Sequence, residues 1–350
     1  MKDADMPLGF VFSYPCLLKS IKSAKLLWWT KGFTAANVVG NDVVRMLEAA
    51  IHRRGDIRVR VKAIMNDTVA QLGAAAYEHG PETQLGVVIG NGCNAAYMEC
   101  TANLTKFDAA GAGYPHENII VVTEWEEYGN KGQLDFILTE FDREVDEHSV
   151  HVGKQIIDKL TGGLYLGELV RRVLDQLCAD SVLFGGERSE YLSLPERFPS
   201  KYIAEILADE GGGHFKNTRR IIDELQIENH RTSDYIVMRE VCQTISRRAA
   251  CIVASAICAI LRIIKKPNVT IGVGGHLYQY HPTLRGLLER EIRELSPSCM
   301  WNIVDSPDGT GRGAALIAAV AEKLKLSEGD TVGPPSDMES ASSSVSEPPL

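Results

Sequence analysis

The spacing of apolar and polar residues along the chain predicts alternating strands and helices. Residues 57–62 alternate between apolar and polar, and Ala63 and Ile64 are then both apolar, which is typical of a strand that enters a sheet interior. Similar runs predict strands at 8–15, 25–29, 85–89, 94–99, 119–123, 268–273 and 299–304. Helical spacing occurs at 43–51, 134–144, 153–160, 165–177, 200–265 and 314–326, with Asn41 or Asp42 as the cap of the first helix and an exposed turn at 246–248. This order predicts an α/β fold.

Composition adds limits on size and on the class of protein. The 350 residues are 45% hydrophobic, which is enough for a large core and indicates more than one domain or lobe. The net charge is -9, with no basic stripe, so we expect no nucleic-acid partner. Residues 327–350 are rich in Ser, Pro and acids, which predicts a disordered tail.

Cysteine and histidine spacing gives no metal site. The eight cysteines include no C-x-x-C pair, so neither zinc nor a disulfide framework is predicted. His148 and His151 have no evident third ligand and are interpreted as surface residues. No apolar run approaches the ~20 residues that span a bilayer. We therefore expect a cytoplasmic protein without a membrane segment.

The end of the strand at 57–64 carries candidate chemistry. Asn66 and Asp67 follow it directly, at the edge where ligands gather in open α/β sheets. A carboxylate there can take a proton from a substrate hydroxyl group. Alternatively, Asn66, Asp67 or Thr68 caps the helix that begins at Val69.

Glycine-rich turns follow several of the predicted strands. Residues 90–93 predict either an ordinary hairpin turn or an anion-binding turn. The glycine-rich loop at 308–313 precedes a helix, an arrangement that suits phosphate. Thr30 and Lys31 lie in another loop, for which a solvated turn is the alternative. Among the close acids Glu124, Glu126 and Glu127, repulsion predicts that at most one points into a cleft.

Four segments together resemble the hexokinases, sugar kinases of the actin-like ATPase superfamily. They are Leu8–Cys16, Trp29–Phe33 (Trp-Thr-Lys-Gly-Phe), Asn66–Val69 (Asn-Asp-Thr-Val) and Tyr165–Glu168 (Tyr-Leu-Gly-Glu). The resemblance runs from about Leu8 to Val320. It implies a hexokinase-like two-lobe fold of the ribonuclease H-like, actin-like ATPase type. The expected small lobe is 1–66 with 308–326 returning to it, the large lobe is 67–307, and hinges are expected near Asn66 and Ser306.

The resemblance implies a function and a sugar site. It implies phosphorylation of glucose, mannose or fructose at the 6-hydroxyl group, the first step of glycolysis, with ATP and Mg²⁺ giving ADP. Asp67 is the expected general base, and Lys31 is expected to hydrogen-bond the sugar and add positive charge near the reaction. The residues expected to bind sugar are Ser13, Thr30, Lys31, Asn66, Asp67, Asn94, Glu124 and Asp158.

The resemblance also implies a nucleotide site and shows departures there. The expected nucleotide residues are Gly90, Asn91, Gly92, Gly163, Leu164, Ser200, Gly275, His276 and Leu277, with no protein metal ligand. Among the expected nucleotide residues and next to them, Asn91 stands where the family has Thr, Gly274 where it has Asp, His276 where it has Ser or Thr, and Leu164 where it has Met. On the sugar side, Glu126 and Glu127 replace Gly and Ala, and Asp158 replaces Glu. The family's first phosphate loop (Asp-x-Gly-Gly-Thr-Asn) is expected before Leu8 and is not present. The sequence is therefore interpreted as a fragment or a short form, and the alternative function is that of a hexose-binding regulator without catalysis.

Overall fold

The computed structural model describes residues 5–108, 111, 113–209 and 214–324. Its strands and longer helices are, in order, β1 (Met6–Val11), β2 (Cys16–Ser20), β3 (Ser23–Leu26), α1 (Val43–Arg54), β4 (Val59–Met65), α2 (Asp67–His79), β5 (Thr83–Ile89), β6 (Cys93–Cys100), β7 (Asn118–Val122), α3 (Glu140–Glu147), α4 (Ile156–Thr161), α5 (Leu166–Ala179), α6 (Glu190–Ser193), α7 (Lys201–Leu207), α8 (Lys216–Glu224), α9 (Thr232–Ile264), β8 (Asn268–Gly274), α10 (His276–Tyr280), α11 (Leu284–Leu295), β9 (Met300–Asp305) and α12 (Gly309–Leu324). Three short 3₁₀ turns are η1 (Thr101–Asn103), η2 (Trp125–Glu127) and η3 (Phe184–Gly186). The predicted tail at 327–350 lies outside the described residues.

The largest sheet has five strands in the order β7-β6-β5-β8-β9. The β5–β6–β7 part is antiparallel, as a hairpin and its neighbour must be, whereas β5, β8 and β9 are parallel. Strands β1 and β4 form a separate parallel pair, and β2 and β3 an antiparallel pair. The α/β class predicted from the sequence is confirmed.

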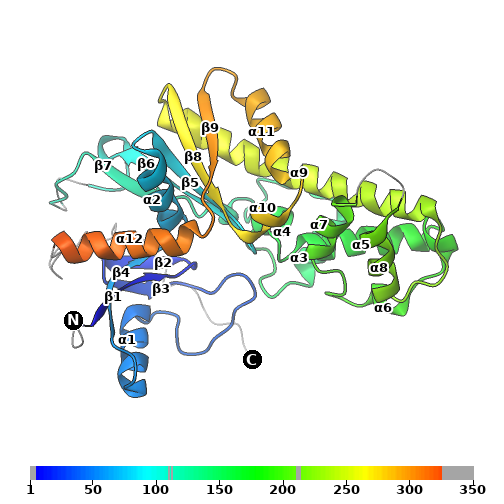
Figure 1. The fold of residues 1–350 in the computed structure, drawn as a ribbon, viewed down its shortest axis with the longest axis horizontal. Coiled ribbons are helices and arrows are strands. Elements are labelled where there is room, and N and C mark those ends of the chain that lie inside the picture. The colour runs from blue at the N-terminus through cyan, green and yellow to red at the C-terminus, as the bar shows by residue number, and fades with distance from the viewer. Residues whose placement is uncertain (1–4, 109–110, 112, 210–213, 325–350) are drawn as a thin grey trace.

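Helix α12 connects the two parts of the molecule. Figure 1 shows it between the five-stranded sheet and the β1–β4 pair, and it packs against α2, β1 and β4. The approach to α2 is very close, because a Cβ atom at Gly313 would lie 1.8 Å from the Ala70 carbonyl oxygen. Only glycine permits this contact, which holds the start of α2 against α12.

Helix α9 forms the longest continuous element and packs against α5, α7 and α11. The turn predicted at 246–248 is wrong, since α9 passes through it unbroken. Ser246 is buried and donates its hydroxyl hydrogen to the Cys242 carbonyl at 2.7 Å, while Arg247 is exposed and Arg248 reaches Asp142 at 2.8 Å. The three polar residues thus lie on different faces of one continuous helix, and none of them interrupts it.

Several helices begin at other residues than the sequence predicts. The helix expected from residue 134 begins only at Glu140, after a capping box made by Thr139 and Asp142. The helix expected from 153 begins at Ile156, and the loop expected at 308–313 is already helical from Gly309. Asp42 is the cap of α1, since its carboxylate accepts from the amides of Val44 and Arg45.

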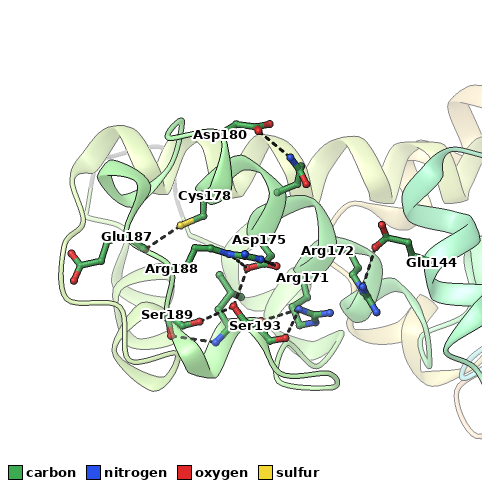
Figure 2. Close-up of polar contacts among 12 residues, drawn as sticks. Glu144, Arg171, Arg172, Asp175, Cys178, Asp180, Glu187, Arg188, Ser189 and Ser193 are labelled. Atoms are coloured by element: carbon green, nitrogen blue, oxygen red, sulfur yellow. Dashed lines mark hydrogen bonds and ion pairs between the residues drawn. The ribbon is translucent and has the colours of Figure 1, made fainter.

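A network of ion pairs fastens α5 to the segment that follows it (Figure 2). Arg171 is 2% exposed, pairs with Glu168 at 2.6 Å and donates to the carbonyls of Leu192 and Ser193 at 3.0 and 3.3 Å. Arg188 pairs with Asp175 at the exposed edge. The buried Arg171 therefore donates hydrogen bonds both to Glu168 on α5 and to two carbonyls at the end of α6.

We expect Arg171→Met to lower the free energy of unfolding by about 3 kcal/mol, because it leaves buried acceptors without a donor. The matched change Arg188→Met removes an exposed pair and should cost less than about 1 kcal/mol. Urea titration followed by tryptophan fluorescence measures both. Equal losses for the two variants would contradict the role given to burial.

Candidate active site

The junction between β4 and α2 places Asn66 and Asp67 at one end of a cavity. Asn66 caps α2, since its Oδ1 atom accepts from the Thr68 amide at 3.0 Å and from the Thr68 hydroxyl at 2.7 Å. Its Nδ2 atom donates to Glu124 Oε1 at 3.3 Å. Asp67 is the first residue of the helix and lines the cavity. The cap interpretation therefore holds for Asn66, and the same turn presents Asp67 to the cavity.

The cavity collects most of the residues expected to bind sugar. Its lining comes from loops and strand ends that are far apart in the sequence: Ser13, Pro15, Thr30, Lys31, Asp67, Val88, Gly92, Cys93, Asn94, Glu124, Glu126 and Asp158. Asn66 joins this group through Glu124. All eight expected sugar residues thus lie at or next to one cavity.

Lys31 is held in place by both neighbouring segments. Its ammonium group donates to the Ser13 carbonyl at 2.8 Å, and its backbone amide donates to Gln155 Oε1 at 3.4 Å. The ammonium also lies 5.6 Å from the centre of the Tyr14 ring, a cation–π distance. A positive charge is thereby fixed at the edge of the cavity.

Three residues around the cavity adopt left-handed backbone conformations that side chains disfavour. They are Lys31 (φ 56°), Glu124 (φ 45°) and Gln155 (φ 56°). Such conformations cost free energy and persist where the surrounding structure holds them, most often at functional sites. The strain marks this cavity as the candidate active site.

The acids of the cavity are more buried than expected. Asp158 is 1% exposed, and its Oδ1 atom accepts from the Cys93 amide at 2.7 Å. Burial raises the pKa of Asp158 to about 7, opposed by the hydrogen bond from Cys93 and the charge of Lys31. Burial and, after it, the neighbouring Glu124 raise the pKa of Glu126 far above its ordinary value.

The prediction that at most one of Glu124, Glu126 and Glu127 points into a cleft is wrong. Glu124 and Glu126 both line the cavity, and Glu127 is half-buried. Glu124 precedes the η2 turn in a left-handed conformation and Glu126 lies within the turn. Burial raises the pKa of Glu126, and its neutral form would not repel Glu124, which is the repulsion on which the expectation depended.

The glycine turns expected to hold a nucleotide also lie together. The amides of Gly163 and Leu164 donate to the carbonyls of Gly90 and Asn91 at 2.8 and 3.1 Å. A Cβ atom at Gly90 would lie 3.3 Å from His276 Nδ1, so this imidazole faces the same turns. These contacts fix the two turns against each other, and the expected phosphate-binding role of the turns stays a prediction.

Comparison with known proteins now decides the family. A family model described as hexokinase matches residues 84–320, and a second hexokinase model matches residues 1–77. This chain belongs to the hexokinase family.

Individual hexokinases support this assignment. The chain is 45% identical to a hexokinase of Brugia malayi over 322 residues, which are 91% of this chain and 56% of that protein. It is 38% identical to human Hexokinase-1 over 93% of this chain and 35% of that protein. The chain thus spans about one third of the length of the human relative and somewhat over half of the length of the Brugia malayi relative.

A solved structure of a hexokinase from Schistosoma mansoni, complexed with glucose, has the same fold. It superposes with a TM-score of 0.84 at 34% identity, over 91% of this chain and 71% of that one. The hexokinase-like two-lobe fold expected from the sequence is therefore confirmed.

Other residues expected to bind a nucleotide occupy supporting positions in this chain. The Ser200 hydroxyl accepts from the Gly167 amide at 2.9 Å and donates to the Gly163 carbonyl, so it fixes the glycine turn. Leu277 is 8% exposed and its side chain packs in the main core. Gly92, expected on the nucleotide side, instead borders the cavity that contains Asp67, beside Asp158.

Sequence reasoning missed other residues at the site. Glu126, Cys93, Val88 and Pro15 line the cavity, and Gln155 is fully buried beside Lys31. Of the two histidines expected at the surface, His148 is exposed, but His151 is half-buried. In the sequence, only the closely spaced acids Glu124, Glu126 and Glu127 indicated that Glu126 belongs to a site. Nothing in the sequence around Gln155 indicated that it lies at the cavity.

Gly274 and Gly309 border a buried polar side chain, that of Gln71. Gln71 is 1% exposed, with both side-chain amide atoms unpartnered, and it lies against Gly274 and Gly309, where Cβ atoms would come within 2.5 and 2.3 Å of its Oε1. The described residues contain no group of three or more His, Cys, Asp or Glu side chains placed so as to hold a metal ion. A Mg²⁺ ion carried by a nucleotide needs few protein ligands, because phosphate oxygens and water supply most of its coordination.

The raised pKa of Asp158 predicts a pH-dependent stability. The folded state binds a proton that the unfolded state releases above its ordinary pKa, so stability falls as pH rises from about 4 through about 7. Between pH 5 and 8 the free energy of unfolding of the wild type should fall by roughly 2 kcal/mol through Asp158, and this fall should be absent in Asp158→Asn. Urea unfolding at each pH measures it. Asp180→Asn, at an exposed position, should leave the wild-type pH profile in place. An unchanged profile in Asp158→Asn would contradict burial as the cause.

Proposed function

We propose that this chain acts as an ATP-dependent hexose kinase that phosphorylates glucose and related hexoses at the 6-hydroxyl group. The observation that carries the proposal is the convergence of Asp67, Lys31, Asn94 and Glu124 on one cavity from four separate segments. The similarity to a hexokinase that binds glucose supports a sugar as the ligand.

Asp67 would accept the proton of the attacking hydroxyl group. A carboxylate at a helix start that borders the cavity has an open position for this contact. Ser13, Thr30, Asn66, Asn94, Glu124 and Asp158 would hold the other hydroxyl groups, and Lys31 would add positive charge beside the reacting oxygen. Phosphoryl transfer depends mainly on alignment and charge, which such a set provides.

The nucleotide would supply the phosphoryl group on the glycine side of the site. Gly90, Asn91, Gly163, Leu164, Gly275 and His276 would face its phosphates, with Ser200 supporting the turn and Leu277 contributing only backbone. Residues 5–66 with 308–324 would form the small lobe and 67–307 the large lobe. Closure near Asn66 and Ser306 would exclude water from the sugar.

A hexose-binding role without catalysis is the second candidate. It is favoured by the nucleotide side, where Gly274 stands in place of the family's usual Asp and the unpartnered Gln71 amide fills the space beside it. Calorimetry separates the two functions. Glucose binding together with Mg-ATP binding supports the kinase, whereas glucose binding alone supports the binding role.

Asp67→Ala should abolish phosphorylation, with a fall of at least ~100-fold in turnover, because a general base contributes on this order. Sugar affinity should stay within about threefold, since other groups hold the remaining hydroxyls. Asp67→Asn, which preserves the shape of the side chain, should lose turnover equally. A coupled assay for hexose 6-phosphate with glucose, fructose and mannose measures turnover.

Turnover retained in either Asp67 variant would remove Asp67 from the role of base. Absence of turnover in the wild type with all three sugars would reject the kinase function and leave the binding role.

A further inference from the structure

Glu126 is a buried acid within the cavity that no expected role explains. Its side chain is 5% exposed and lines the cavity together with Glu124 and Asp158. The η2 turn that carries it is anchored by Trp125, whose indole donates to the Cys93 carbonyl at 2.6 Å. The Cys93 amide donates to Asp158, so Cys93 connects the turn that carries Glu126 to Asp158.

Two carboxyl oxygens in this cavity have no hydrogen-bond partner among the described residues. They are Glu126 Oε2 and Asp158 Oδ2, both shielded from solvent. A buried polar atom without a partner costs about 1–3 kcal/mol. Two such atoms on one cavity point to a ligand that carries several hydrogen-bond donors.

The groups facing Glu126 determine its form. Glu124 and Asp158 repel a negative charge on Glu126. Asp67 is a further acid in the lining of the cavity, and Lys31 contributes a positive charge there. Burial also disfavours the ionised form, so Glu126 carries a proton at neutral pH. A neutral acid within hydrogen-bonding reach of Glu124 can donate to it and still accept from a ligand.

From this geometry, and resting on the proposed hexose site, we propose that Glu126 is a further substrate-binding residue. One carboxyl oxygen bonds Glu124, and Oε2 accepts a hydrogen bond from one hydroxyl group of the bound sugar. Glu126 thereby makes the pocket selective for a sugar that bears this hydroxyl.

Two side chains of similar length separate this role from that of a space filler. Glu126→Gln keeps a neutral donor and acceptor, whereas Glu126→Met fills the same space and can do neither. Glu126→Ala provides a second loss variant. Glu127→Met changes the adjacent half-buried acid, which does not line the cavity, and is the matched control.

The experiment is calorimetric titration of each protein with glucose and with deoxyglucoses that each lack one hydroxyl group. We expect one deoxyglucose to bind the wild type about tenfold more weakly than glucose does, the loss typical of one hydrogen bond. For that sugar the difference should vanish in Glu126→Met and Glu126→Ala and persist in Glu126→Gln and Glu127→Met.

Two results would overturn the proposal. One is an equal loss for every sugar in Glu126→Met, which marks a space-filling role. The other is an unchanged pattern in both loss variants. Wild-type protein that binds none of the sugars would instead reject the hexose site itself, and the inference with it.

Discussion

The hydrogen bonds of a single amide, Asn66, connect the parts on which the site depends. Its oxygen closes the first turn of α2 and its nitrogen holds Glu124, on a loop almost sixty residues further along. Strand β4, helix α2 and the η2 turn are therefore registered against one another at the point where Asp67 faces the cavity. Any shift of this amide would move a carboxylate on each side of the pocket.

The cavity concentrates more acid than one lysine can neutralise. Four carboxyl groups line it together with the ammonium group of Lys31. Burial raises the free energy of each ionised carboxylate, so ionisation of all four at once is unfavourable. Burial raises the pKa of Glu126 far above its ordinary value and that of Asp158 to about 7, so Glu126 favours its neutral form and Asp158 titrates near neutral pH. A neutral carboxyl group can donate a hydrogen bond as well as accept one.

Local sequence patterns placed most of the strands, because alternation or a short apolar run is typical of a strand in a sheet, but they missed β2 and extended the strand at 25–29 beyond Leu26, where β3 ends. Helix starts were harder, since Thr139 and Gln155 delay α3 and α4 through capping and backbone conformation that periodicity does not report. Ser246 misled because a buried hydroxyl can bond the preceding turn of its own helix. The site residues were predicted through their resemblance to a family, and Glu126 escaped because its burial follows from a fold that no local pattern specifies.

The close contact between Gly313 and Ala70 has a consequence for the position of Asp67. Because no side chain separates them, α2 and α12 already lie as close as their backbones allow, and any side chain at residue 313 would push the start of α2 away from α12. Asp67 lies within one helical turn of Ala70, on the same helix. The absence of a side chain at residue 313 therefore helps to set where this carboxylate lies in the cavity.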